Sequence, residues 1–317
     1  MPDQLGAPLD QPVFERLALV GLGLIGSSLA RVARRKNLAR TLIAIDASET
    51  VRNRVQQLGL ADHVTGDVAE GVGNADCVIL CVPVGVCGVV AEAMKAGLKA
   101  GAIISDVGSV KGSVVAQVEP HLPAHVHFVP AHPVAGTEQS GPDAGFASLF
   151  HNRWCILTPP EGTNADAVAR MRAFWEGAGS NVEEMTPPHH DLVLAITSHL
   201  PHLIAYNIVG TAADLEAVTQ SEVIKFSAGG FRDFTRIAAS DPTMWRDVFL
   251  NNKDAVLEML GRFTEDLSAL QRAIRWGDGA ALFEHFTRTR AIRRSIIEIG
   301  QDSAAPDFGR QPKENGA

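Results

Sequence analysis

The stretch Leu17-Ala-Leu-Val-Gly-Leu-Gly-Leu-Ile-Gly-Ser-Ser-Leu-Ala30 decides the fold of this chain. Its first residues, Leu17–Val20, form a short apolar run typical of a buried strand. A helical pattern follows over Ile25–Lys36, and glycines with the spacing GxGxxG separate the two. A strand, a glycine-rich turn and a helix in this order predict a dinucleotide-binding loop.

Each of the three glycines has its own task in such a loop. Gly21 allows the tight turn, Gly23 lets the backbone approach a pyrophosphate, and Gly26 lets the helix pack closely on the strand. The pyrophosphate then lies at the positive end of the helix dipole. We therefore expect the cofactor to contact this loop, including Leu24 and Ile25 at the start of the helix.

An acidic residue after the next apolar run supports the same site. Asp46 follows Thr41–Ile45 and lies 20 residues beyond Gly26, about where a ribose-binding carboxylate belongs. A carboxylate there accepts hydrogen bonds from the ribose hydroxyls of NAD and repels the 2′-phosphate of NADP. Neither of the next two residues is a cation, and Arg52 is expected to face solvent. The predicted cofactor is therefore NAD.

Short apolar runs and helical patterns alternate over residues 17–186. The candidate strands are Leu17–Val20, Thr41–Ile45, Cys77–Val82, Ala102–Ser105, His127–Val129, Cys155–Thr158 and Val182–Met185. The candidate helices between them are Ile25–Lys36, Glu49–Gln57, Gly85–Ala96 and Ala165–Gly177. This alternation predicts a mostly parallel sheet with helices on both faces.

The pattern changes after Pro187-Pro188, beyond which only helical spacing recurs. The predicted fold is an α/β Rossmann-type dinucleotide-binding domain (17–186) followed by an all-α domain (187–300). Residues 1–16 are expected to be a flexible N-terminus, and residues 301–317 a disordered tail.

Composition narrows the class of protein and of partner. The chain has 317 residues, 46% hydrophobic and 20% charged, with a net charge of −8, which argues against nucleic acid or an anionic membrane as partner. Its four cysteines form no CxxC pair, and free thiols favour the reducing cytoplasm. We see no signal peptide and no apolar stretch long enough to span a bilayer.

Polar residues follow several predicted strands, and the carboxyl ends of parallel strands meet at one edge. Val82 and Pro83 would lie beside the adenosine or the nicotinamide ribose, although a simple turn explains them equally well. Ser109 can hydrogen-bond a substrate hydroxyl or a catalytic imidazole. Lys111 either meets an anion or is a solvated residue of the first helical turn.

His132 also follows a strand, in the segment Phe128-Val-Pro-Ala-His-Pro-Val-Ala-Gly. A lone histidine is more often structural than catalytic. Its place at a strand end, in a chain with a dinucleotide loop, favours function. Because histidine titrates near neutral pH, it suits removal of an alcohol proton while hydride leaves the same carbon.

In the helical half, His199 and His202 follow Asp191 and share one helix face. Pro201 between them is expected to kink the helix, because it cannot donate a backbone hydrogen bond. Substrate binding is favoured over a zinc site, for which further ligands are missing, and no metal is predicted. A polar contact between helices is the alternative, above all for His199.

A further segment carries two arginines among aromatic and small residues. Arg236 can clamp a carboxylate through two parallel hydrogen bonds, and Trp245 can cover a ring. For Arg232 we favour an ion pair with Asp233 or Asp241.

Together these segments resemble the prephenate/arogenate (cyclohexadienyl) dehydrogenase family. The runs that carry the resemblance are GLGLIGSSLA, SDVGSVKG, HPVAGTEQSG, TSHLPH and GGFRDFTRIAASDPTMW. The resemblance implies an NAD-dependent oxidoreductase acting on a CH–CH group, which converts prephenate to 4-hydroxyphenylpyruvate and CO2 in tyrosine biosynthesis. It also implies a homodimer formed through the helical domain.

The resemblance assigns roles to individual residues. His132 would be the catalytic histidine and Ser109 the active-site serine. Arg236 would bind the ring carboxylate of the substrate, with His202 helping to hold it. The remaining pocket residues, some supplied by a partner subunit, would be Glu138, Gly229 and Trp245.

Other functions remain open from the sequence. The substrate could be arogenate, or both compounds for a dual-substrate cyclohexadienyl dehydrogenase. A β-hydroxyacid dehydrogenase or an imine reductase has a similar build. A non-catalytic NAD-sensing protein would need the glycines and Asp46, but neither His132 nor Arg236. The preferred hypothesis requires those last two side chains to face each other across the nicotinamide.

Overall fold

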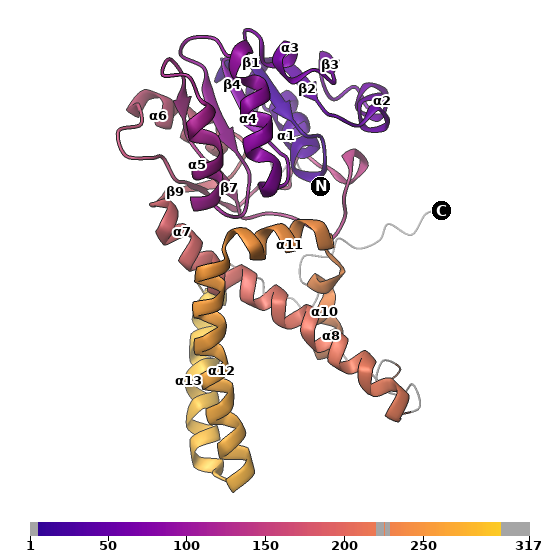
Figure 1. Ribbon diagram of the computed structural model, residues 1–317, viewed down its shortest axis with the longest axis vertical. Coiled ribbons are helices and arrows are strands. Elements are labelled where there is room, and N and C mark those ends of the chain that lie inside the picture. The colour runs from indigo at the N-terminus through magenta and orange to yellow at the C-terminus, as the bar shows by residue number, and fades with distance from the viewer. Residues whose placement is uncertain (1–5, 220–224, 226–228, 299–317) are drawn as a thin grey trace. The chain divides into compact units, whose positions relative to one another are not determined.

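The computed structural model describes residues 6–219, 225 and 229–298 (Figure 1). The chain divides into two compact units, Met1–Met259 and Leu260–Ala317. The tail 301–317, expected to be disordered, lies outside the described residues, as do the first five residues of the expected flexible N-terminus.

A six-stranded parallel sheet forms the centre of the first unit, in the order β3-β2-β1-β4-β5-β6. Its strands are β1 (Phe14–Val20), β2 (Ala39–Ile45), β3 (His63–Thr65), β4 (Cys77–Leu80), β5 (Ile103–Asp106) and β6 (His127–Phe128). The strand order reverses between β1 and β4, as in Rossmann-type sheets, and ligands bind beyond the carboxyl ends at this point. The predicted parallel sheet is confirmed.

Side chains alternate between the two faces of this sheet. Leu17 and Leu19 of β1 belong to one apolar core, which also contains residues of α1 (Leu24–Arg35) and α6 (Ala165–Gly177). Ala18 and Val20 belong to a second core. That second core contains residues of α3 (Val68–Val72), α4 (Cys87–Met94) and α5 (Gly112–Val118). Helices therefore cover both faces, and α2 (Glu49–Gln57) follows β2 (Figure 1).

A second, three-stranded sheet was not expected. It consists of β7 (Ala131–Pro133), β8 (Trp154–Leu157) and β9 (Asn181–Glu184). β7 pairs antiparallel with β8, and β8 pairs parallel with β9. The sequence predicted β8 and β9 as members of the main sheet and missed β7, because three residues that end in proline give no strand pattern.

After Pro187 the described residues form helices. These are α7 (Pro187–Leu194), a π-helical turn (Ala195–His199), α8 (Leu200–Thr219), α10 (Gly229–Thr235), a 3-10 turn (Arg236–Ala239), α11 (Pro242–Asn251), α12 (Lys253–Trp276) and α13 (Gly279–Glu298). Pro187 lies in the first turn of α7, where its missing N–H costs nothing. A π-helical turn lies just before Pro201, where the sequence predicted a kink.

The first compact unit extends past the domain boundary expected at residue 187. Trp245 and Val248 of α11 belong to the same apolar core as α4 and α5. Asn252 donates a hydrogen bond to the backbone carbonyl of Asp191, 2.9 Å away. These contacts join α7 and α11 to the α/β part within the first compact unit, which ends inside α12.

The segment before β1 is held by hydrogen bonds from its first described residues onward. Leu9 and Val13 donate backbone hydrogen bonds to the carbonyls of Lys36 and Leu38. The Lys36 ammonium in turn donates to the carbonyl of Ala7. This differs from the flexible segment expected over residues 1–16, and β1 itself begins at Phe14.

One helical run among the described residues, Pro187–Asp214, is long and apolar enough to cross a membrane by length and composition alone. The sequence led us to expect none. The run carries buried polar residues, His190, Asp191 and His199, which hydrogen-bond to protein groups. A core helix of a soluble protein meets the same two criteria, so the finding is weak evidence for a membrane span.

The second unit contains the C-terminal part of α12 and all of α13. Both helices present large apolar side chains to solvent. Among them Trp276 and Phe283 are each 75% exposed. Exposed apolar side chains in such number are typical of a surface that another protein covers.

Candidate active site

The glycine loop after β1 has the geometry of a phosphate-binding turn. Gly21 has φ +93°, and a Cβ there would lie 2.6 Å from the carbonyl oxygen of Cys81. A Cβ at Gly26 would lie 2.0 Å from the carbonyl oxygen of Gly21, whereas a Cβ at Gly23 would meet nothing within 4 Å. The close approaches hold the start of α1 against the loop, and the space beside Gly23 is open to a ligand.

The first N–H groups of α1 complete this cradle. The helix begins at Leu24, and no side chain caps it. The N–H groups of Leu24, Ile25 and Gly26 precede the first intrahelical donor, since the earliest helical hydrogen bond runs from Ser27 to Gly23. Free amides and the helix dipole together attract a phosphate group.

Asp46 lies beside the same loop, at the end of β2. One carboxylate oxygen accepts the N–H of Leu22 at 2.8 Å, and the other accepts the N–H of Ser48 at 2.9 Å. The remaining lone pairs are available to ribose hydroxyls. Arg52, expected to face solvent, instead turns back and donates to the carbonyl oxygens of Asp46 and Ala47. Its guanidinium thereby closes the turn after β2.

The loop after β4 lies against the glycine loop. Gly21 is so close to it that a Cβ there would lie 3.0 Å from Val82 Cγ1. Pro83 caps the 3-10 turn Val84–Val86 that leads into α4. Since β1 and β4 are neighbours at the switch point of the sheet, Val82 and Pro83 lie next to the cradle.

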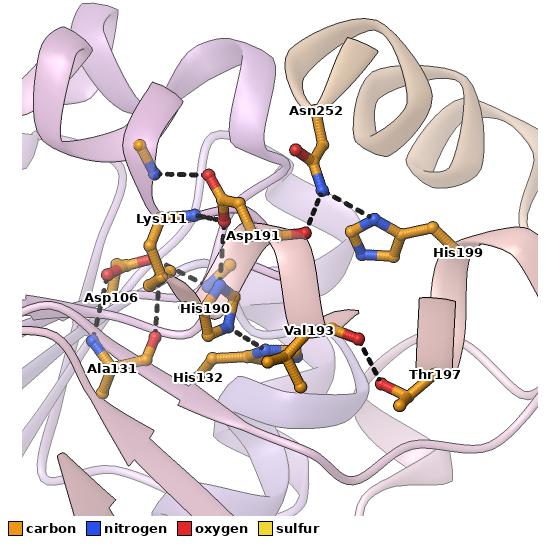
Figure 2. Close-up of polar contacts among 12 residues, drawn as sticks. Asp106, Lys111, Ala131, His132, His190, Asp191, Val193, Thr197, His199 and Asn252 are labelled. Carbon is orange, nitrogen blue, oxygen red and sulfur yellow. Dashed lines mark hydrogen bonds and ion pairs between the residues drawn. The ribbon is translucent and has the colours of Figure 1, made fainter. Parts of the chain in front are cut away.

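His132 lies in the middle of β7, paired with Ile156 of β8, and only 6% of it is exposed. Its Nδ1 lies 2.8 Å from Nε2 of His190 on α7. The two rings meet edge to face, with centroids 5.0 Å apart (Figure 2). Because His190 occupies Nδ1, Nε2 is the nitrogen left for a ligand.

Asp191 follows His190 and anchors the beginning of α5. Its Oδ1 lies 2.8 Å from His190 Nδ1 and accepts the backbone N–H of Lys111 at 2.7 Å. Its Oδ2 accepts the N–H of Gly112 at 2.8 Å. Figure 2 shows His190 between His132 and Asp191, with Lys111 beside them. The carboxylate thus joins α5 to α7 and orients the histidine pair.

Lys111 is fully buried, so the expectation of a solvated residue is wrong, and the anion that it meets is a carboxylate of the protein itself. Its ammonium forms an ion pair with Asp106 at the end of β5 and donates to the carbonyl oxygen of Ala131 at 2.7 Å. Asp106 also accepts the N–H of Gly108 at 2.7 Å. The pair therefore fixes the backbone directly before His132.

Burial decides the protonation of this cluster. Desolvation, helped by the charges of His190 and Lys111, lowers the pKa of His132 well below its ordinary value. Desolvation also lowers the pKa of His190, although the hydrogen bond to Asp191 acts in the opposite direction. Burial alone would raise the pKa of Asp191, but hydrogen bonds from His190 and two backbone amides lower it. At neutral pH the histidines are therefore neutral and the carboxylate is ionised.

Ser109 lies half-buried in the loop between β5 and α5. Within the described part of the chain it makes no hydrogen bond to His132, whose Nδ1 is taken by His190. The orientation of the imidazole therefore depends on His190.

His199 is buried in the π-helical turn. Asn252 donates to its Nδ1 at 3.1 Å, which leaves the proton on Nε2. Nε2 has no hydrogen-bond partner among the described residues. Burial, with a contribution from the charge of His190, lowers the pKa of His199 to about 4. His199 is thus a neutral group at neutral pH.

His202, Trp245, Arg236 and Glu138 form a second group. His202 stacks on Trp245 with ring centroids 3.6 Å apart, and it bonds the carbonyl of Ser198 through Nδ1. Arg236 makes an ion pair with Glu138 at 3.1 Å. Desolvation lowers the pKa of His202, and the positive charge of Arg236 adds to this shift. Glu138 follows His132 by six residues, so the ion pair ties the loop of His132 to the helical part.

Gly229 and Arg232 lie apart from these contacts. Gly229 begins α10, and the described contacts do not link it to His132. Arg232 lies 3.7 Å from Asp233, which is one of the two ion pairs expected for it. No group of three or more histidine, cysteine, aspartate or glutamate side chains within the described residues is arranged to hold a metal ion.

Sequence reasoning missed His190 and Asn252, and gave Asp191 no role. The signal for the pair was present, because a histidine and an aspartate stand side by side in the first turns of the helix after Pro187-Pro188. Asn252 gave no signal, since an asparagine between two helices is typical of a turn.

The fold and these groups define a class of protein: a nucleotide-binding α/β unit with a buried histidine beside the carboxyl end of β5. Two sequence models of one family match adjacent stretches of this chain. The model described as "Prephenate dehydrogenase, nucleotide-binding domain" matches residues 29–184, and "Prephenate dehydrogenase, dimerization domain" matches residues 186–288. The chain belongs to the prephenate dehydrogenase family.

Individual relatives agree with this assignment. The chain is 46% identical to a cyclohexadienyl dehydrogenase of Zymomonas mobilis, over 90% of this chain and 97% of that protein. It is 35% identical to a prephenate dehydrogenase of Bacillus subtilis, over 93% of this chain and 79% of that protein. A crystal structure of prephenate dehydrogenase from A. aeolicus, with hydroxyphenyl propionate and NAD+, superposes with a TM-score of 0.83. It shares 33% identity and covers 89% of this chain and 98% of that one.

Proposed function

We propose that this protein oxidises and decarboxylates prephenate to 4-hydroxyphenylpyruvate and CO2, with NAD as cofactor, in tyrosine biosynthesis. The observation that carries the proposal is the ion pair between Arg236 and Glu138. This ion pair brings the guanidinium of Arg236, which would bind the ring carboxylate, to the loop that follows His132. Membership of the family, with the matching name of the Bacillus subtilis relative, supports the same substrate.

His132 acts as the base in this proposal. Its free Nε2 takes the proton of the ring hydroxyl and holds it while the ring loses its carboxylate as CO2. The electron pair of the broken carbon–carbon bond makes the ring aromatic, and Nε2 returns the proton to the phenolate oxygen. Burial keeps the pKa of His132 low, so the imidazole is unprotonated when the substrate arrives.

The residues around the glycine loop fit NAD. The open space beside Gly23 and the free amides of α1 suit its pyrophosphate, and Asp46 suits an adenosine ribose without a 2′-phosphate. When bound, NAD accepts the hydride from the ring carbon that carries the hydroxyl. Val82 and Pro83 would pack beside the cofactor, and Ser109 would orient the hydroxyl toward His132.

Arg236 and His202 hold the substrate in this proposal. Arg236 is 42% exposed, so its guanidinium is accessible to a carboxylate. A bidentate contact would fix the ring without protonating the group that must leave. His202 presents Nε2, since Nδ1 is used by Ser198, and Trp245 supports its ring. Gly229, Glu138 and His199 would complete the pocket, some of them from a partner subunit.

We assign the cofactor domain to residues 17–186 and the substrate and dimerisation domain to residues 187–300. A homodimer is supported by the match to a dimerization domain and by the exposed apolar side chains of α12 and α13. A cytoplasmic location is supported by four free cysteines. Burial raises the pKa of the Cys87 thiol to about 12, so this thiol stays protonated.

Arogenate is the second candidate substrate. It is favoured by one observation, the 46% identity to a protein named cyclohexadienyl dehydrogenase, a name that covers both compounds. The two substrates differ only in a side chain, keto acid or amino acid, so the proposed machinery for the ring serves both.

A side-by-side assay tests the proposal. Purified protein is given prephenate or arogenate, each with NAD or NADP, and NADH or NADPH formation is followed by absorbance. We expect turnover with prephenate and NAD. Turnover with arogenate alone would replace the substrate, and no reduced cofactor under any of the four conditions would refute the enzyme assignment.

A further inference from the structure

We propose that His190 and Asp191 act with His132 as a relay, which fixes the tautomer of His132 and shares the positive charge that His132 acquires. They are positioning residues, because they act through His132 and need not touch the substrate. The inference rests on the proposed function for its role in turnover. Its structural part, the tautomer, stands independently of any substrate.

The three side chains form an unbroken chain of short contacts. His132 Nδ1 lies 2.8 Å from His190 Nε2, and His190 Nδ1 lies 2.8 Å from Asp191 Oδ1. The carboxylate is held in turn by the backbone N–H groups of Lys111 and Gly112. Each ring nitrogen that faces the protein interior therefore has a single, fixed partner.

These contacts determine where the protons lie. An ionised carboxylate only accepts hydrogen bonds, so Asp191 requires the proton of His190 to be on Nδ1. The Nε2 of a neutral His190 is then an acceptor, and the contact with His132 requires a proton on Nδ1 of His132. The remaining nitrogen of His132, Nε2, is left with its lone pair outward. The relay thus presents His132 as a base.

The same chain can take up charge during the reaction. When Nε2 of His132 accepts a proton, the imidazolium can pass its Nδ1 proton to His190. The positive charge then lies beside the carboxylate of Asp191, and the transfer reverses when the proton returns to the product. Proton number is conserved, and no group outside the relay is needed.

The other charged groups around His132 and His190 do not offset the positive charge that these rings acquire. Lys111 faces it from the start of α5, and His199 faces it from the π-helical turn, both raising the cost of a positive charge. Asp106, at the end of β5, is paired with the Lys111 ammonium. The neighbouring thiol of Cys155 stays protonated because burial raises its pKa. Asp191 is therefore the carboxylate that offsets the charge.

The chain offers a matched control for kinetic tests. His189 precedes His190 on α7 but is exposed to solvent. We expect His190→Gln to lower kcat about tenfold to a hundredfold, less than the roughly hundredfold to ten-thousandfold contributed by a group that transfers the substrate proton itself, while KM changes little. His189→Gln should leave kcat and KM unchanged.

Asp191→Asn should also lower kcat. It should move the acidic limb of the kcat–pH profile to lower pH, because the carboxylate favours the protonated form of the histidine pair.

A double variant separates a relay from a structural role. Because His190 acts only through His132, the variant His132→Gln/His190→Gln should turn over no more slowly than His132→Gln alone. Losses that multiply in the double variant would overturn the proposal. So would a His190→Gln enzyme with raised KM and normal kcat.

The tautomer can be measured on the unaltered protein, and a variant is needed only to assign the His132 signal. Nitrogen-15 NMR of the histidine-labelled protein, with His132 assigned by its loss in His132→Gln, distinguishes a protonated from an unprotonated ring nitrogen. We expect the proton on Nδ1 of His132, and a proton on Nε2 would refute the relay. If the protein oxidised neither prephenate nor arogenate, the proposed function would fail, while this spectrum would still decide the relay.

Discussion

At the scale of single residues, the task we propose for Arg236, binding the ring carboxylate, is the most specific. Replacing it with glutamine should raise KM for the substrate about tenfold to a hundredfold and alter kcat much less, because a charged hydrogen bond to a carboxylate is lost. Steady-state kinetics measure both constants. Arg232→Gln is the matched control, since that arginine is exposed and pairs with Asp233. An unchanged KM in Arg236→Gln would show that the guanidinium does not bind the substrate.

A substitution at Lys111 tests how much the buried ion pair with Asp106 contributes to stability. Lys111→Met should lower the free energy of unfolding by about 3–5 kcal/mol, because it leaves the buried carboxylate of Asp106 without its partner. Chemical denaturation of both proteins gives the difference. Lys95→Met, which breaks an exposed pair with Glu92, should cost no more than about 1 kcal/mol. Equal losses in the two variants would contradict this account of Lys111.

The sequence predicted His132, Arg236 and Trp245 as site residues because each residue type suits one chemical task. It could not predict that Lys111 is buried, because burial depends on Asp106 and the carbonyl of Ala131 arriving from other strands. His190 was missed for the same reason. Its partner, His132, is 58 residues away in the sequence.

At the scale of elements, we expect the start of α1 to determine how tightly the cofactor binds. Gly26→Ala should destabilise the protein, since its Cβ would lie 2.0 Å from a backbone oxygen that cannot move freely. Gly23→Ala should fold normally, because nothing lies within 4 Å, yet bind NAD more weakly. Thermal unfolding and NAD titration of both variants test the pair. If Gly23→Ala bound NAD normally, the cofactor would not approach this backbone.

The bounds of some helices could be predicted from the local sequence pattern alone. The helices Glu49–Gln57 and Ala165–Gly177 were predicted with the bounds that the structure has. Both have a side-chain cap at the N-terminus, from Ser48 and Asn164. The strand β7, which carries His132, was missed because its pairing with β8 is a tertiary contact. No pattern within three residues encodes such a contact.

At the scale of the whole molecule, the buried histidines predict how stability depends on pH. An unfolded chain protonates a histidine near its ordinary pKa of 6.5, whereas burial holds the pKa of folded His199 at about 4. Between these values the unfolded state binds more protons, so stability falls as the pH is lowered. The lowered pKa values of His132 and His190 act in the same direction.

Urea denaturation at several pH values between 7.5 and 4.5, bounds that enclose most of this window, checks the prediction. Replacing His199 with glutamine should make the dependence less steep, whereas the same change at the exposed His189 should not alter it. A stability that stayed constant or rose on acidification would contradict the prediction.

The sequence by itself determined the dinucleotide loop, the parallel sheet and the change to helices at Pro187. These features follow from glycine spacing, hydrophobic period and helix-starting residues, all of which act over neighbouring positions. Only the tertiary structure decided that His190 and Asp191 support His132, that Lys111 is buried, and that Arg236 meets Glu138. Those contacts join residues far apart in the chain, and packing of one element on another is what creates them.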